Sequence, residues 1–298
     1  MDAPRQTMPA GAPVDLDGRG RTWVYDSGPP ARPRPTVLLL HGWTSSAAMN
    51  WFRCFAPLAE RYRVVALDHR GHGRGIRSRR PFSLEDCADD AAALAETLAT
   101  GPVIAVGYSM GGPVALQLWR RYPESVAGLV LCATAARFAV RSELARPIGA
   151  VTYGMSLALA GVPSRVRTEA LRFVIRRRGY AAGVAQWAVE EWERHDPAAL
   201  IQAGLAIGRF DAREWLASID VPTAVVVTTT DTTVAPRGQW ELAQRIPRAM
   251  AFPVAADHRA CVDEAPTFVP ALLAACGAVE DASRPRAGAT PPRPGRQR

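Results

Sequence analysis

The stretch that decides the fold is GYSMGG, at residues 107–112. It follows a short apolar run, 103–106, and opens a helical pattern that continues to Tyr122. Small residues two positions before and after Ser109 let a chain turn sharply from a strand into a helix without a Cβ clash. Such a turn exposes the serine hydroxyl beside the first N–H groups of a helix. We therefore predict that Ser109 is a nucleophile. The alternative is a glycine-rich loop with an incidental serine.

Short apolar runs recur along the chain, and helical patterns separate them. Runs without polar interruption are typical of strands that are buried on both faces. We expect strands at 21–26, 36–40, 62–67, 103–106, 126–132, 223–229 and, more weakly, 250–254. We expect helices at 83–100, 109–122, 240–245 and 266–276. Ser83 can cap the first of these helices. The alternation predicts an α/β fold with a mostly parallel central sheet flanked by helices.

The alternation stops in one long segment, which has helical patterns and no strand signal. One amphipathic piece covers 164–178, and another holds Val184, Trp187, Ala188 and Trp192 at helical spacing. An insertion of this kind predicts a helical cap, or lid, over the carboxyl ends of the strands, where open α/β sheets bind ligands. The predicted organisation is a flexible leader, a core in two parts around the cap, and a disordered tail, at 1–20, 21–135, 136–215, 216–276 and 277–298.

A serine nucleophile needs a base, and histidine suits that role near neutral pH. Of five histidines, His258 lies in a polar loop after the last strand. His195 lies in the predicted cap and reads as a surface residue. Asp231, just beyond the strand 223–229, is the predicted acid that orients His258. Asp257 is a weaker candidate, because chain neighbours rarely place their side chains for such a contact.

The residues after the first buried strand read His41-Gly42-Trp43-Thr44. Gly42 would let the backbone approach a substrate closely. We expect the N–H groups of Trp43 and Met110 to form an oxyanion hole. His41 reads as a structural histidine. Residues predicted to line a substrate pocket, with ordinary core packing as the alternative, are Trp51, Phe52, Tyr108 and Trp187.

The segment 68–73, Asp-His-Arg-Gly-His-Gly, ends the second buried strand. A metal site of Asp68, His69 and His72 is one interpretation. We favour a tight turn stabilised by Asp68 and Arg70, because this spacing offers too few ligands for a closed site. The five cysteines have no metal-binding spacing, so we expect reduced thiols, no metal and no cofactor.

The net charge of +8 comes with 36 basic residues, all of them arginine. Arginines of the proline-rich tail supply part of it, so the charge is weak evidence for a nucleic-acid partner, and we expect none. The expected ligand is the small-molecule ester that a serine nucleophile would attack. The cap carries a basic run of Arg172 and Arg176 to Arg178. A solvated helix face is its commoner explanation, and a weak membrane-surface contact is the alternative. The chain shows no secretory signal, which favours a cytoplasmic protein.

Taken together, these motifs resemble the α/β-hydrolase superfamily, over about residues 21–276. The matching elements are the HG motif at His41, the D-x-R-G-x-G turn from Asp68 to Gly73, the elbow around Ser109, the D-x-x-V motif at Asp231 and the histidine before the last helix. The resemblance implies a serine esterase-like or lipase-like member with a helical lid. A serine nucleophile argues against the related epoxide hydrolases and haloalkane dehalogenases, whose nucleophile is aspartate.

The expected activity is hydrolysis of carboxylic esters, with hydrophobic acyl groups favoured, through an acyl-enzyme on Ser109. Acyl transfer and cofactor-free perhydrolysis would use the same three residues. A non-catalytic binding protein of the same fold is the alternative from another class. Retention of a serine, an acid and a histidine argues against a pure receptor.

Overall fold

A computed structural model of the chain describes residues 8–29, 34–138, 166, 169 and 182–284. The described part contains one sheet of eight strands in the order β1-β2-β4-β3-β5-β6-β7-β8. The strands are β1 (Ala12–Leu16), β2 (Gly20–Asp26), β3 (Thr36–Leu40), β4 (Arg63–Leu67), β5 (Val103–Tyr108), β6 (Val126–Cys132), β7 (Thr223–Thr228) and β8 (Met250–Val254). From β4 to β8 all neighbours run parallel, whereas β1 and β2 are antiparallel additions at one edge. The predicted α/β fold with a mostly parallel sheet is confirmed.

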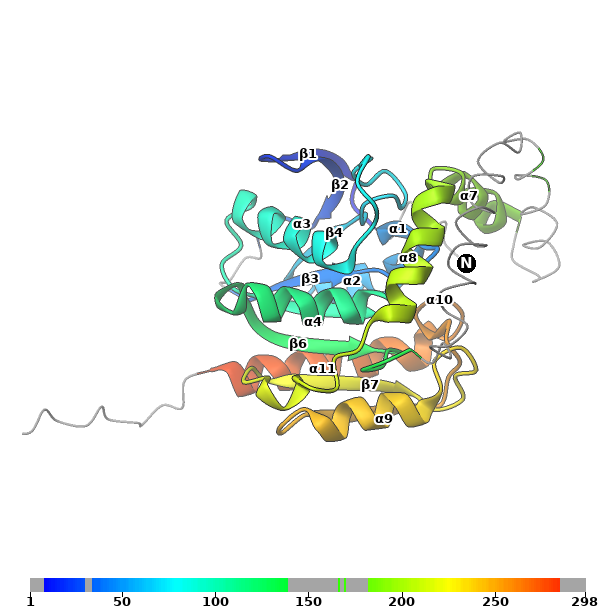
Figure 1. Cartoon of the computed structure of the whole chain (residues 1–298). Helices are drawn as coiled ribbons and strands as arrows, with labels where there is room; N and C mark the ends of the chain where they lie inside the picture. The colour runs from blue at the N-terminus through cyan, green and yellow to red at the C-terminus, as the bar shows by residue number, and fades with distance from the viewer. Residues whose placement is uncertain (1–7, 30–33, 139–165, 167–168, 170–181, 285–298) are drawn as a thin grey trace, which may run out of the picture.

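Helices cover both faces of this sheet (Figure 1). The helices are α1 (Ala47–Trp51), α2 (Phe55–Ala59), α3 (Leu84–Thr97), α4 (Gly111–Arg121), α7 (Ala182–Trp192), α8 (Pro197–Arg209), α9 (Pro236–Arg245), α10 (Ala260–Asp263) and α11 (Ala265–Ser283), with short 3₁₀ turns η2 (Pro123–Ser125) and η3 (Leu216–Ser218). Ser83 caps α3 by accepting a hydrogen bond from the N–H of Asp86, as predicted.

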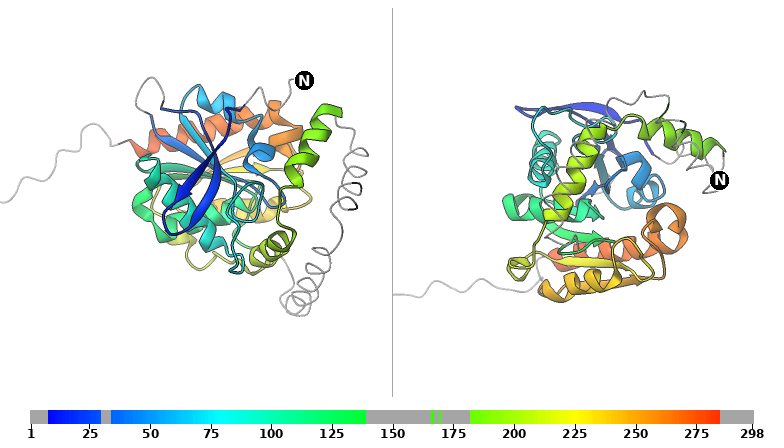
Figure 2. Two further views of the ribbon diagram at one scale, coloured as in Figure 1. Left: turned by 90° about the horizontal axis from the view of Figure 1, so that it is seen from above. Right: turned by 45° about the vertical axis from the view of Figure 1, so that its right-hand side comes forward.

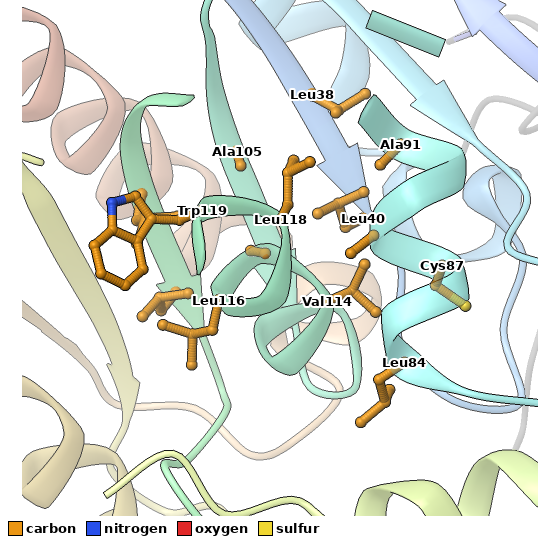
Figure 3. Close-up of a cluster of buried hydrophobic side chains, with 14 of the residues drawn as sticks. Leu38, Leu40, Leu84, Cys87, Ala91, Ala105, Val114, Leu116, Leu118 and Trp119 are labelled. Carbon is orange, nitrogen blue, oxygen red and sulfur yellow. The ribbon is translucent and has the colours of Figure 1, made fainter. Parts of the chain in front are cut away.

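The strands are buried on both faces because alternate side chains enter two separate cores. Leu38 and Leu40 of β3 point into the core under α3, α4 and α9, whereas Val37 and Leu39 point into the core under α1, α2, α10 and α11. Figure 3 shows the first core, where Leu38 lies near Ala91 of α3 and Leu40 lies near Val114 of α4. Continuous apolar runs therefore belong to central strands, as the sequence pattern indicated.

Two predicted boundaries were wrong. The leader is not loose throughout, because β1 pairs with β2 in register and Leu16 is buried in the first core. Figure 2 shows this pair as a long ribbon at one edge of the molecule. The tail does not begin at residue 277, because α11 continues to Ser283 and buries Val279. The polar, proline-rich composition of the leader gave no strand signal for β1. Small residues gave no clear signal for the end of α11.

Two helices, α7 and α8, lie in the segment predicted as a cap. Figure 1 shows α8 crossing the end of the sheet toward which the arrowhead of β7 points. The amphipathic piece predicted at 164–178 and the arginines of its basic run lie outside the described residues, apart from Val166 and Glu169. No helix within the described ranges is long and apolar enough to cross a membrane.

Candidate active site

Ser109 occupies the turn between β5 and α4 in a strained conformation. Its φ is +53°, a left-handed value that costs a non-glycine residue energy and is often found at functional sites. The turn is tight enough that a Cβ on Gly107 would lie 2.2 Å from the Gly111 carbonyl oxygen. A Cβ on Gly111 would lie 2.0 Å from the Leu40 carbonyl oxygen. The glycines of the motif are therefore required by the backbone packing around Ser109.

The structure brings the three residues predicted as nucleophile, base and acid into one hydrogen-bonded chain. Ser109 Oγ lies 3.0 Å from His258 Nε2, and His258 Nδ1 lies 2.7 Å from Asp231 Oδ2. They come from three different loops, which follow β5, β7 and β8. Asp231 is buried, and the His258 side chain is largely buried. This arrangement can accept a proton from Ser109 and hold the imidazole in one orientation.

Asp231 is held by both of its oxygens. Oδ1 accepts hydrogen bonds from the N–H groups of Thr233 and Val234, each at 2.8 Å. Oδ2 accepts from Thr228 Oγ1 at 2.8 Å and from Gln239 Nε2 at 3.2 Å, in addition to His258. Burial by itself would raise the pKa of this carboxyl, but the hydrogen bonds outweigh it and the pKa is lowered. Asp231 therefore stays ionised beside His258.

Tyr108, a predicted pocket residue, is hydrogen-bonded to the backbone of His258, the predicted base. Its hydroxyl donates a hydrogen bond to the His258 carbonyl oxygen at 2.8 Å. Burial raises the pKa of Tyr108, so its hydroxyl remains a donor. Trp51 is fully buried and packs edge-on against Tyr108, with ring centroids 5.9 Å apart. Both side chains belong to the second buried core, and they remain predictions as pocket residues.

Phe52 and Trp187 meet between the core and α7. Their rings lie 5.5 Å apart in an edge-on arrangement. Phe52 is buried, and Trp187 packs against the second core from α7. An apolar contact of this kind attaches α7 to the core, and both residues remain predictions as pocket walls.

The loop after β3 lies directly beside Ser109. A Cβ on Gly42 would stand 3.3 Å from Ser109 Cβ, so the backbone approaches the nucleophile closely. Among the described residues, no backbone carbonyl accepts from the N–H of Trp43 or from that of Met110. Both groups are thus available donors near Ser109, which is what the predicted oxyanion hole needs.

The segment after β4 is a turn held by Asp68. Its carboxylate accepts hydrogen bonds from the N–H groups of Ala47 and Arg74, each at 2.8 Å. Burial raises the pKa of Asp68 to about 6. Arg70 pairs with Asp90 at 2.7 Å. No cluster within the described ranges could hold a metal ion.

His41 and His195 both contact backbone atoms through their rings. His41 accepts from the N–H of His69 at 2.9 Å through Nε2, and its Nδ1 lies 2.8 Å from the Gly42 carbonyl oxygen. His195 was expected at the surface, and that expectation was wrong, because its ring is buried against Ser45. Asp257 accepts from the N–H of Thr232 at 3.2 Å.

Sequence reasoning missed Thr228, Gln239 and Thr134. Thr134 Oγ1 donates to the Ser109 carbonyl oxygen at 2.8 Å, and Gln239 is fully buried against Thr228 and Asp231. Thr134 follows an apolar run, and Thr228 lies at the end of another. A polar residue at such a position could have indicated a contact at the edge of the sheet. Gln239 carried no such signal, because the predicted helix began after it.

Comparison with known proteins places this geometry in a family. The chain matches the alpha/beta hydrolase fold family over residues 35–265. It is 32% identical over 204 residues to a pimeloyl-[acyl-carrier protein] methyl ester esterase of Neisseria meningitidis, an alignment that covers 67% of this chain and 77% of that protein. It is 32% identical over 154 residues to a 2-(acetamidomethylene)succinate hydrolase of Mesorhizobium japonicum, covering 45% of this chain and 54% of that protein.

Solved structures show the same architecture. The enol-lactonase of Burkholderia xenovorans LB400 superposes with a TM-score of 0.72 at 22% identity, covering 89% of this chain and 100% of that one. A thermophilic esterase of Thermogutta terrifontis superposes with a TM-score of 0.73 at 22% identity, covering 91% and 100%. The chain therefore belongs to the alpha/beta hydrolase fold family, as an esterase-like hydrolase.

Proposed function

We propose that this protein hydrolyses carboxylic esters through an acyl-enzyme formed on Ser109. The observation that carries the proposal is the continuous hydrogen-bonded chain from Ser109 through His258 to Asp231. A serine hydroxyl is a weak nucleophile unless a base takes its proton during attack. A strained, half-buried serine beside an oriented imidazole meets that requirement.

The reaction would proceed in two steps. Ser109 Oγ attacks the ester carbonyl while His258 Nε2 takes the hydroxyl proton, and Asp231 stabilises the imidazolium. The N–H groups of Trp43 and Met110 stabilise the tetrahedral oxyanion. His258 then returns the proton to the leaving alkoxide, the C–O bond breaks, and an alcohol departs. Water then attacks the acyl-enzyme while the same imidazole takes its proton. The bond between Ser109 Oγ and the acyl carbon breaks, His258 returns the proton to Ser109 Oγ, and a carboxylic acid is released.

The acyl group that we favour is apolar. Phe52 and Trp187 lie between the core and α7, and Trp51 lies against Tyr108 beside the base. Aromatic walls of this kind favour apolar ligands, with a few polar groups for orientation. The relatives named for a methyl ester of a protein-bound acyl chain and for a substituted succinate support ester-like carbonyl substrates in general.

The decisive test combines covalent labelling with substitution of the nucleophile. We expect a fluorophosphonate probe to label the protein at Ser109, and nitrophenyl esters to be turned over with a preference for apolar acyl chains. Ser109→Ala should abolish the labelling and should lower the esterase activity by about 10⁴-fold or more. Ser218→Ala, at an exposed serine, is the matched control and should behave as the unsubstituted protein. A Ser109→Ala variant that keeps most of its esterase activity would refute the proposal.

A further inference from the structure

The described cap segment, residues 182–209, is hydrogen-bonded to the loop that carries the Trp43 N–H. Trp43 Nε1 donates to the Leu200 carbonyl oxygen of α8 at 2.6 Å. His195, in the connection between α7 and α8, places its Nε2 3.0 Å from the Ser45 carbonyl oxygen. The two contacts fall on either side of Thr44, so the cap holds this loop at two points.

His195 is built into this contact, because its ring is buried. Its ring stacks on Trp192 and lies edge-on to His72, with centroids 6.0 and 5.6 Å away. Burial lowers the pKa of His195, so the ring is neutral near pH 7 and carries one N–H. The Nδ1 atom lies 3.2 Å from the Glu191 carbonyl oxygen, whereas Nε2 lies closer to the Ser45 carbonyl oxygen. Because the Nε2 contact is the shorter one, we assign the N–H to Nε2.

Gly204 allows α8 to lie directly on the indole of Trp43. A Cβ at residue 204 would stand 2.8 Å from Trp43 Cζ2, which is closer than real Cβ contacts. A glycine inside a helix costs about 1 kcal/mol relative to alanine. Its presence at the point of contact shows that the close approach of the helix to the indole depends on this position.

The other side of the loop is fixed to the core. The N–H of Gly42 donates to Asn50 Oδ1 at 3.0 Å, and the His41 ring is bonded to the backbone of residues 42 and 69. Thr44 has a left-handed φ of +56°, a conformation that needs support from its surroundings. The N–H of Trp43 therefore lies between an anchor in the core and two anchors in the cap.

We propose that His195, Gly204 and the Leu200 carbonyl position the Trp43 N–H for oxyanion stabilisation, so that the cap is part of the catalytic geometry as well as a cover. The inference rests on the proposed function. None of the three cap residues contacts Ser109 or His258 through a hydrogen bond in the described structure. They are positioning residues, which act through the loop.

The test uses substitutions that disturb the contacts from opposite sides. Trp43→Phe removes the indole donor and keeps an aromatic ring, and Gly204→Ala pushes the indole away from α8. His195→Leu removes the bond to Ser45, and His195→Gln restores an N–H donor. We expect the first three variants to lower kcat by about tenfold, with KM changed by less than about twofold, because a donor to the transition state is displaced while substrate binding is retained. His195→Gln should recover most of the loss.

Two further measurements separate positioning from a merely structural role. Titration with a fluorophosphonate gives the fraction of intact sites, so that kcat is expressed per site. The affinity for a trifluoromethyl ketone, whose adduct carries the tetrahedral oxyanion, should weaken in parallel with kcat/KM across the variants. Gly277→Ala is the matched control, because a Cβ there meets nothing within 4 Å, and it should leave both quantities unchanged.

The outcomes are distinct. Per-site kcat and ketone affinity that stay within twofold in Trp43→Phe and Gly204→Ala would overturn the positioning proposal. A lower fraction of intact sites with unchanged per-site kcat would also overturn it, since that is loss of folded protein. Failure of Ser109 to label in the unsubstituted protein would instead refute the proposed function.

Discussion

Asp231 illustrates how much of this site depends on single side chains that do not react. Its Oδ2 accepts hydrogen bonds from three donors, and one of them is His258. The other two, Thr228 and Gln239, are also bonded to each other at 2.9 Å. A buried carboxylate without such donors would be partly rotated or protonated, and the imidazole would lose its orientation.

Thr228→Val should test this support at the residue scale. Valine matches threonine in shape but removes the donor to Asp231, so we expect kcat to fall about fivefold to tenfold with KM nearly unchanged. Stability should fall by roughly 1–2 kcal/mol, because a buried hydrogen bond is lost. Steady-state kinetics and urea unfolding measure the two effects. Thr228→Ser keeps the hydroxyl and should keep the activity; equal losses in both variants would contradict the assigned role.

At the scale of elements, β1 and β2 extend the sheet beyond its parallel part. Arg19, in the turn between them, pairs with Asp90 of α3 at 2.6 Å, and the same carboxylate pairs with Arg70. The edge hairpin is therefore bonded to the helix that covers the first core and to the turn after β4. This explains why a segment with a polar, proline-rich composition is ordered.

Leu16→Ala should show that this edge is part of the fold. Leu16 is 2% exposed and belongs to the first core, so its truncation leaves a cavity that costs about 2–4 kcal/mol. Urea unfolding measures the change in the free energy of unfolding. Asp17→Ala, at the exposed neighbouring residue, is the control and should change it little. An unchanged free energy of unfolding in Leu16→Ala would mean that β1 does not pack on the core in solution.

Over the whole molecule, burial determines the protonation state of the cysteines. All five are free and buried, as Cys54, Cys87, Cys132, Cys261 and Cys276. Burial raises the pKa of Cys261 and of Cys276 to about 12. Thiols rather than thiolates are therefore present near neutral pH, and a buried neutral thiol is a poor nucleophile.

Folding should consequently protect the thiols from chemical modification. The free energy of unfolding should fall as the pH becomes alkaline. Ellman's reagent at pH 8 should modify less than about one thiol per folded chain, and all five after unfolding. Because the folded pKa of Cys276 lies above its unfolded value, its contribution is complete below about pH 8.5 and is lost as the pH rises toward 12. Urea unfolding at pH 8 and pH 10 measures this slope. Cys276→Ala should reduce the slope; rapid modification of the folded protein would contradict the burial of the thiols.

Prediction from the sequence succeeded where the physical signal is local. The strands 36–40, 126–132 and 250–254 have the predicted boundaries, because an apolar run flanked by turn residues is a short-range property. It failed at 12–16 and at 277–283, where packing against α3 and the second core orders residues of ambiguous composition. Burial of His195 also came from a distant contact, with Ser45.

The sequence by itself determined the alternation of strands and helices, the elbow around Ser109, and the identity of the candidate nucleophile, base and acid, because turn geometry and chain order depend on neighbouring residues. Only the tertiary structure decided which side chains hold Asp231, and that α8 lies against the Trp43 loop. Gln239 and Asp231 are brought together by the packing of α9 on β7, and Leu200 and Trp43 are 157 residues apart. Such contacts depend on how the folded elements stack, and no local pattern records them.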